Sequence, residues 1–121
     1  MSGSWRLGAA ATIALLVLHW SWAWQVPLPH LGFLASALLF SLPLLPPAIA
    51  FLLRRPRAPL WAGIAALLYF CHGIAEWRAA PAQWPWAAAE TALALAMVLA
   101  AGWPGIAAKL VKRRAARPPT V

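Results

Sequence analysis

Five side chains that can donate, accept or carry a proton lie within long apolar runs of this sequence: His19, Tyr69, His72, Glu76 and Glu90. Histidine and carboxylate groups exchange protons and bind cations, and an ionisable group inside a membrane span is a candidate functional site. Tyr69, His72 and Glu76 follow one another at helical spacing, which places them on one stripe of a helix. The sequence therefore predicts a polar cluster inside an otherwise apolar protein.

Two interpretations of this cluster remain open. In the structural one, the groups form a buried hydrogen-bond network that fixes helix register. In the functional one, they bind protons or a ligand. A charge at the centre of a bilayer costs about 2.5–3.5 kcal/mol on insertion scales, so we expect Glu90 to face the bundle rather than lipid. Its candidate partners are His72, His19 and Arg78.

The elements that must position these groups are membrane spans. The chain has 121 residues, of which 64% are apolar and 10% charged, and Glu76 and Glu90 are its only acidic residues. A soluble domain needs a surface with charges of both signs, and this composition falls in the membrane class. The single cysteine excludes an internal disulfide. The net charge of +8 is better explained by membrane topology and anionic headgroups than by nucleic acid, which we do not expect as a partner.

The apolar runs predict four transmembrane helices, because about 20 residues cross a hydrocarbon core. The expected architecture is all-α, an antiparallel four-helix transmembrane bundle formed by residues 1–108. A basic cytoplasmic tail, residues 109–121, follows it and is expected to be disordered or bound to headgroups. The predicted spans cover residues 7–26, 31–53, 60–77 and 86–107. A short turn at Pro27 to His30 joins the first two.

Orientation follows from the basic residues, which cytoplasmic loops carry in excess. With four spans, both termini lie on one side. Arg78 is the only basic residue expected on the opposite side. The side of the termini holds the other nine: Arg6, Arg54, Arg55, Arg57, Lys109, Lys112, Arg113, Arg114 and Arg117. This asymmetry predicts that both termini face the cytoplasm, with tryptophans near both interfaces.

The second span contains Pro43, Pro46 and Pro47. Each proline removes a backbone donor and frees a carbonyl about one turn earlier, which needs another partner inside a membrane. We expect a kinked helix packed against the bundle; a hinge or a break that lines a cavity is the alternative.

The fourth span carries a stripe of alanines at intervals of four residues: Ala88, Ala92, Ala96 and Ala100. Small residues at this spacing let helices approach closely. Glu90 points about 200° away from Ala88 at about 100° per residue. This helix can therefore face the bundle with one side and a second chain with the other.

The sequence lacks the motifs of common enzymes. There is no serine nucleophile elbow, no Gly-rich phosphate loop and no cysteine pair for zinc. We therefore expect no enzymatic activity, no metal and no cofactor. A bundle that holds a cofactor between His19 and His72 is a remaining alternative, because two histidines on different helices can act as paired axial ligands.

The stretch Leu68-Tyr69-Phe70-Cys71-His72-Gly73-Ile74-Ala75-Glu76 resembles the signature of a bacterial family of inner-membrane proteins, domain of unknown function 2069. The resemblance extends to His19-Trp20, the following prolines, the basic loop at residues 54–57 and Glu90, and so covers nearly the whole chain. It implies a four-span protein of the bacterial cell inner membrane and implies no activity.

Three functions remain in competition at this point. The leading interpretation is a non-enzymatic accessory or assembly factor that acts by helix–helix contact. Its partners would be the bilayer, anionic headgroups at the cytoplasmic face, and another membrane protein or a second copy of itself. The first alternative is a small oligomeric proton-coupled transporter that uses Glu90, Glu76 and His72. The second is the cofactor-holding bundle built on His19 and His72.

Overall fold

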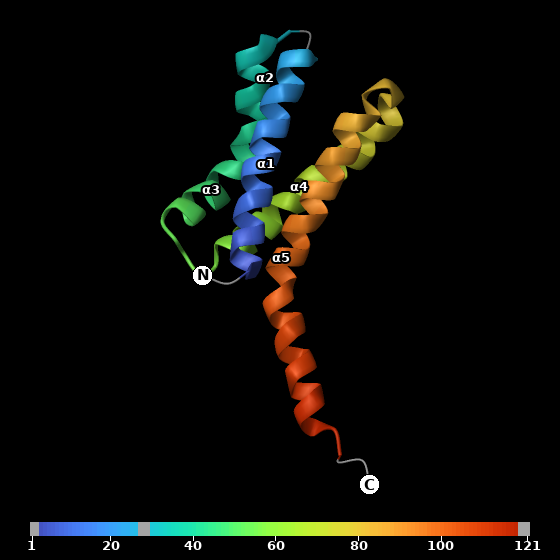
Figure 1. Ribbon diagram of the computed structural model, residues 1–121. Coiled ribbons are helices and arrows are strands. Elements are labelled where there is room, and N and C mark those ends of the chain that lie inside the picture. Colours follow the sequence, from blue (N-terminus) through green and yellow to red (C-terminus); the bar gives the residue numbers. More distant parts are fainter. Residues whose placement is uncertain (1–2, 27–29, 119–121) are drawn as a thin grey trace.

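The computed structural model describes residues 3–26 and 30–118, which form four helical segments long and apolar enough to cross a membrane (Figure 1). No strand occurs among these residues. The predicted all-α, four-span fold is therefore confirmed. The elements are α1 (Gly3–Gln25), α2 (Gly32–Ser41), the 3₁₀ turn η1 (Leu42–Leu44), α3 (Leu45–Leu52), α4 (Ala58–Ala79), the 3₁₀ turn η2 (Pro81–Gln83) and α5 (Trp84–Ala116).

The last helix is longer than predicted. α5 has 33 residues, so at about 1.5 Å per residue it is longer than the roughly 30 Å of a hydrocarbon core. Its C-terminal part leaves the bundle as a straight rod (Figure 1). The expectation of a disordered tail is wrong up to Ala116, because Ala, Leu, Lys and Arg all favour the helix. The predicted turn residues 27–29 and the last three residues lie outside the described part of the chain.

A 3₁₀ turn at the prolines breaks the regular α-helix of the second span, and its two parts form the kinked helix expected from the sequence (Figure 1). α2 ends at Ser41, and a 3₁₀ turn containing Pro43 leads into α3. The N–H of Leu42 donates to the carbonyl of Leu39, the group that Pro43 leaves without its helical donor. Tyr69 on α4 donates its hydroxyl to the carbonyl of Phe40. The break is therefore supplied with hydrogen bonds from inside the protein, as a bilayer requires.

The helices form two hairpins that meet along α1 and α5. One hairpin is α1 with α2, and the other is α4 with α5 (Figure 1). Both hairpin connections lie at the same end of the molecule, here called the hairpin end. The start of α1 and the α3–α4 loop lie at the opposite end, the termini end. Toward the hairpin end the two hairpins diverge, so the space between them widens (Figure 1).

Small residues bring α4 and α5 into close contact. A Cβ atom added at Gly63 would lie 2.6 Å from the Cβ of Ala101. A Cβ added at Gly73 would collide with Oγ1 of Thr91 and lie 3.2 Å from the carbonyl oxygen of Ala87. Both glycines are therefore needed for the present helix separation, the kind of contact on which membrane helices depend.

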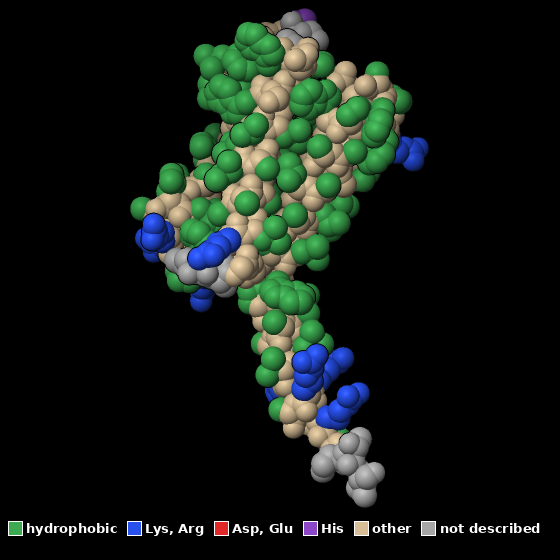
Figure 2. Space-filling view, viewed as in Figure 1, with side chains coloured by type: hydrophobic (Ala, Val, Ile, Leu, Met, Phe, Trp, Pro, Cys, Tyr) green, Lys and Arg blue, Asp and Glu red, His purple; other side chains and the backbone are tan. Residues whose placement is uncertain are grey.

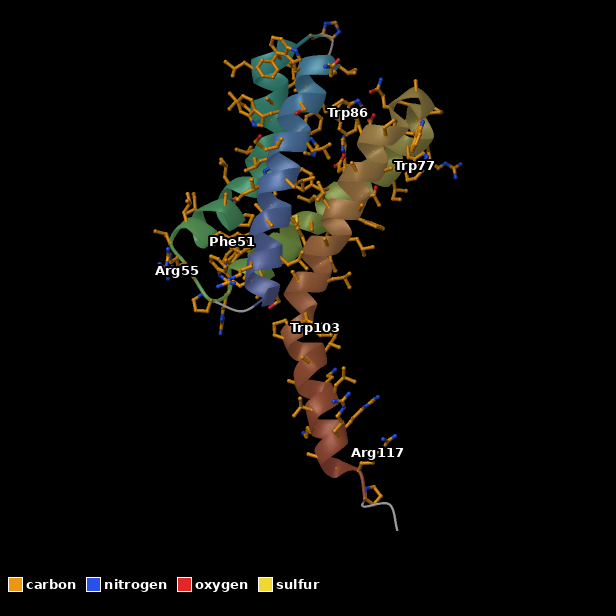
Figure 3. The ribbon with its side chains drawn as sticks, viewed as in Figure 1. Phe51, Arg55, Trp77, Trp86, Trp103 and Arg117 are labelled. Carbon is orange, nitrogen blue, oxygen red and sulfur yellow. The ribbon has the colours of Figure 1, made fainter. Side chains whose placement is uncertain are left out.

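The surface matches a protein surrounded by lipid. Figure 2 shows hydrophobic side chains over the bundle, with Lys and Arg gathered at the termini end and along the protruding part of α5. Arg78 occupies the last turn of α4, at the hairpin end. Trp77 and Trp86 lie toward the hairpin end and Trp103 toward the other (Figure 3). Aromatic side chains thus occur near both ends of the bundle, where interfaces are expected.

Candidate functional site

The five residues of the predicted polar cluster come together between the two hairpins. His19 belongs to α1, Glu90 to α5, and Tyr69, His72 and Glu76 to successive turns of α4. The centroid of the His19 ring lies 5.1 Å from that of Tyr69 and 6.1 Å from that of His72. Three helices that are separate in sequence therefore build one site.

Glu90 is the centre of this site and is fully buried. Its two carboxylate oxygens lie 2.8 and 2.9 Å from Nδ1 of His72. Its Oε1 also lies 3.5 Å from Nε2 of His19, whose side chain is 1% exposed. One hydrogen bond to an imidazole and a second imidazole close by make burial of a carboxylate acceptable in lipid, where an unpaired charge is costly.

His72 connects the buried carboxylate to a more accessible one. Its Nε2 lies 4.0 Å from Oε1 of Glu76, one turn further along α4. This distance is too long for a direct hydrogen bond. The two ring nitrogens of His72 therefore face the two acidic side chains of the protein, one buried and one partly exposed.

Aromatic rings enclose the two histidines. His19 stacks on Trp22 with an interplanar angle of 19° and on Phe40 with an angle of 14°. Both of these aromatic rings also contact His72. Trp22 in turn stacks on Trp86 of α5. Tryptophans were expected only near the membrane interfaces, and Phe40 was not selected from the sequence. The spacing of three residues between His19 and Trp22 is the signal that could have identified Trp22.

A cavity of about 300 Å³ lies beside the cluster, between the diverging hairpins. Its wall includes both histidines of the cluster, His19 and His72, and the carboxylate of Glu76. The remaining lining is aromatic, aliphatic or polar: Trp22, Ala23, Val26, Ser36, Phe40, Ala80 and Gln83. Because its lining comes from the hairpin-end parts of α1, α2 and α4 and from η2, the cavity lies at the hairpin end.

Toward the termini end, the core beyond the cluster is apolar. Leu15, Leu44 and Met97 are fully buried there and pack with buried alanines such as Ala66 and Ala94. This layer fills the space between the helices in the conformation described. The polar cluster is thus reached by the cavity on one side and bounded by packed apolar side chains on the other.

The other residues that the sequence selected lie away from this site. The alanine stripe winds around α5: Ala92 is exposed, Ala88 and Ala96 are partly buried, and Ala100 is in the core beside Gly8. Four residues turn a helix by about 400°, so the stripe drifts by about 40° at each step. Arg78 makes no ion pair with either carboxylate among the described residues. The basic residues of loop and tail lie at the termini end: Arg54, Arg55, Arg57, Lys109, Lys112, Arg113, Arg114 and Arg117.

Within residues 3–26 and 30–118, no three His, Cys, Asp or Glu side chains are grouped so that they could hold a metal ion. Nδ1 of His72 is directed at Glu90, and Trp22, Phe40 and Tyr69 pack against the His19 ring. Protein side chains thus occupy part of the space around the two imidazoles, and the cavity occupies another part.

Comparison with known proteins identifies the family. The model of the family described as "Predicted membrane protein (DUF2069)" matches residues 7–104. The chain belongs to this family, as the resemblance at residues 68–76 indicated. Neither the curated proteins nor the solved structures gave a significant match.

Proposed function

We propose that this member of the family is a non-enzymatic protein of the bacterial inner membrane that takes up and releases protons at a periplasmic cavity, as part of a small proton-coupled carrier. The observation that carries the proposal is the position of Glu90. Its carboxylate is fully buried and lies beside imidazoles from two other helices, and both of these histidines line the cavity.

The net charge of the buried groups changes with the number of protons that they hold. Glu90, His19 and His72 together are neutral when they hold one proton beyond their fully deprotonated forms. A second proton gives these three groups a net positive charge, and loss of the first leaves them with a buried negative charge. Because charge is costly in lipid, each change of proton number favours a different arrangement of the surrounding helices or a different ligand.

The arrangement of His72 supports proton exchange with the cavity. A proton that arrives from Glu76 through a water can bind Nε2, while the proton on Nδ1 passes to Glu90. An imidazole is suited to this relay because each of its nitrogens can donate or accept. The cavity then supplies the proton, and the buried carboxylate stores it.

Alternating access requires a second arrangement, because the apolar layer at Leu15, Leu44 and Met97 bounds the site toward the termini end. The two hairpins are the units whose relative movement would open this layer. A homo-oligomer would provide the surface against which they move. The bilayer and its anionic headgroups, which suit the basic rod of α5, are the remaining partners in this proposal.

An accessory or assembly factor that acts by helix–helix contact is the second candidate. The observation in its favour is the face of α5 around Ala92, which is exposed and small enough to admit a partner helix. A cofactor-holding bundle receives less support, since Trp22, Phe40 and Tyr69 already pack against the imidazoles. Crosslinking in native membranes tests the accessory role, which predicts one defined partner of different sequence.

Histidine titration followed by ¹⁵N NMR in nanodiscs tests the proton-coupled proposal. Glu90→Gln should alter the curve of His72, because Nδ1 of His72 lies within hydrogen-bond distance of both carboxylate oxygens of Glu90. His30, exposed on the turn between α1 and α2, is the internal control and should be unaffected. The proposal fails if the folded Glu90→Gln protein gives the wild-type curve for His72. If Glu90→Gln does not fold, Glu76→Gln serves instead and should alter the curve of His72.

A further inference from the structure

We infer that the turn between α3 and α4 binds one anionic phospholipid, with the phosphate among Arg54, Arg55 and Arg57 and one acyl chain in each of two apolar grooves beside α3. This inference is independent of the proposed carrier and concerns the termini end, away from the polar cluster. It stands on the shape of the grooves, on the charge of the turn and on the contacts that fix the turn.

The first groove lies between α1 and α3 and has a volume of about 500 Å³. From Trp5 to Leu16 it follows α1 for about 16 Å at about 1.5 Å per residue, which is about half of the roughly 30 Å of a hydrocarbon core. This is the depth of one leaflet and therefore of one acyl chain. Arg54 belongs to the wall, and the other lining is mainly apolar, including Ala9, Ile13, Ala48, Phe51 and Leu52.

The second groove lies on the other side of α3, between α3 and α4, and has a volume of about 460 Å³. Ile49 and Leu53 form one side and Trp61 of α4 forms another, and all three side chains are more than half exposed. Arg55 and Arg57 belong to its wall at the turn. Two apolar grooves that reach arginines of one turn match a lipid whose two acyl chains leave one headgroup.

The turn is positively charged and has no acidic neighbour. Glu76 and Glu90, the only acidic residues of the sequence, both lie in the polar cluster, so no described carboxylate side chain pairs with the arginines of the turn. Figure 2 shows Lys and Arg side chains gathered at this end. α4 begins directly after Arg57, and the positive end of its macrodipole attracts an anion. An anionic headgroup thus supplies the charge that the protein lacks here.

Contacts to α1 hold the turn in place. Nε1 of Trp5 donates a hydrogen bond of 3.0 Å to the carbonyl of Arg55, and the Trp5 ring packs edge-on against Phe51. The N–H of Arg55 donates to the carbonyl of Ala50 and the N–H of Arg54 to that of Phe51, which are the two bonds of a Schellman motif. Arg54 occupies the left-handed position of this motif with a φ of 53°, where glycine is usual. A cationic side chain thus stands where glycine would fit with less strain.

Native mass spectrometry of the protein in detergent micelles tests the inference, with phosphatidylglycerol and phosphatidylethanolamine of identical acyl chains as probes. We expect one phosphatidylglycerol to bind, at least about tenfold more tightly than phosphatidylethanolamine, because each arginine beside an anionic headgroup favours it about fivefold. Glycerol 3-phosphate has the charge without the chains and should bind at least about tenfold more weakly. Equal binding of the two lipids, equal binding of glycerol 3-phosphate, or no phosphatidylglycerol on folded protein overturns the inference.

A matched pair of double variants locates the headgroup. Arg54→Gln/Arg55→Gln should weaken phosphatidylglycerol binding at least about tenfold. Arg113→Gln/Arg114→Gln removes the same charge from the protruding part of α5 and should leave the binding unchanged. Equal effects of the two variants, or a loss confined to the α5 variant, would place the lipid elsewhere and overturn the inference.

Substitutions of adjacent alanines test the first groove. Ala9→Phe fills part of it and should weaken phosphatidylglycerol binding several-fold. Ala10→Phe, at an exposed position of α1 outside this groove, is the control and should have no effect. Equal effects contradict the assigned groove, and Ala48→Leu on the α3 wall replaces Ala9→Phe if that variant does not fold. The histidine titration does not involve this site, so a failure here leaves the proton-coupled proposal standing.

Discussion

Nδ1 of His72 lies within hydrogen-bond distance of both carboxylate oxygens of Glu90, at 2.8 and 2.9 Å. This contact joins α4 to α5 next to Gly73, where the absence of a side chain lets the two helices touch. The polar pair and the glycine contact therefore support one another: the pair holds the helices together, and the close approach brings the imidazole within reach of the carboxylate.

His72→Leu should destabilise the protein by about 2 kcal/mol. The substitution leaves the buried Glu90 carboxylate with only His19, at 3.5 Å, and an unpaired buried charge is costly, although polar contacts between membrane helices are individually modest. Unfolding in mixed micelles measures the change. His30→Leu, on the exposed turn, is the control and should have little effect.

Replacing His72 and Glu90 together measures the energy of their interaction, apart from what each side chain contributes alone. The double variant His72→Leu/Glu90→Leu should be more stable than His72→Leu alone, because no unpaired carboxylate remains. A double variant whose loss equals the sum of the two single losses would show that the two side chains do not interact.

Gly73→Ala should destabilise the protein by about 1–3 kcal/mol, the usual range for overpacking. The new methyl group meets Oγ1 of Thr91 and lies 3.2 Å from the carbonyl oxygen of Ala87, a backbone atom that cannot rotate away. Gly102→Ala is the matched control, since a Cβ there has nothing within 4 Å. It should be neutral or stabilising by up to about 1 kcal/mol through helix propensity. Equal losses at the two glycines in micelle unfolding would contradict this account of the α4–α5 contact.

The sequence predicted the polar cluster because few polar groups occur in the spans. Among long apolar runs, His19 and Glu90 stand out, and lipid leaves such groups no favourable place except the bundle interior. The number of helices followed from the same physics, since about 20 apolar residues are needed for each crossing. These features depend on composition along the chain and need no knowledge of helix packing.

The aromatic enclosure and the cavity could not be predicted in the same way. Phe40 reaches the cluster because α2 packs beside α1 and ends at the proline break. The spacing of apolar residues does not predict how α2 lies against α1. The length of α5 was missed for another reason: a basic segment with high helix propensity continues a helix after the apolar span ends. Hydropathy indicates where the chain leaves the lipid, and the helix can continue beyond that point.

Tyr69→Phe should lower stability by about 1 kcal/mol or somewhat more, because the carbonyl of Phe40 loses its donor beside the proline break. In a Pro43→Ala background the helix can continue past Ser41, and the N–H of Leu44 can reach that carbonyl instead. The loss caused by Tyr69→Phe should therefore shrink in this background. Thermal unfolding of the four proteins of this cycle measures the difference, and an undiminished loss would mean that Tyr69 acts through packing alone.

The orientation prediction rests on nine basic residues at the termini end against Arg78 at the other. A C-terminal green fluorescent protein should fluoresce and a C-terminal alkaline phosphatase should be inactive, because both termini are expected in the cytoplasm. Neutralising the five basic residues of the tail leaves four against one, so this result should persist. Neutralising Arg54, Arg55 and Arg57 as well leaves Arg6 against Arg78, and a mixed population with active phosphatase should appear. Arg78→Gln is the control and should not change the orientation. Phosphatase activity from the unmodified protein would reverse the orientation and place the cavity on the cytoplasmic side.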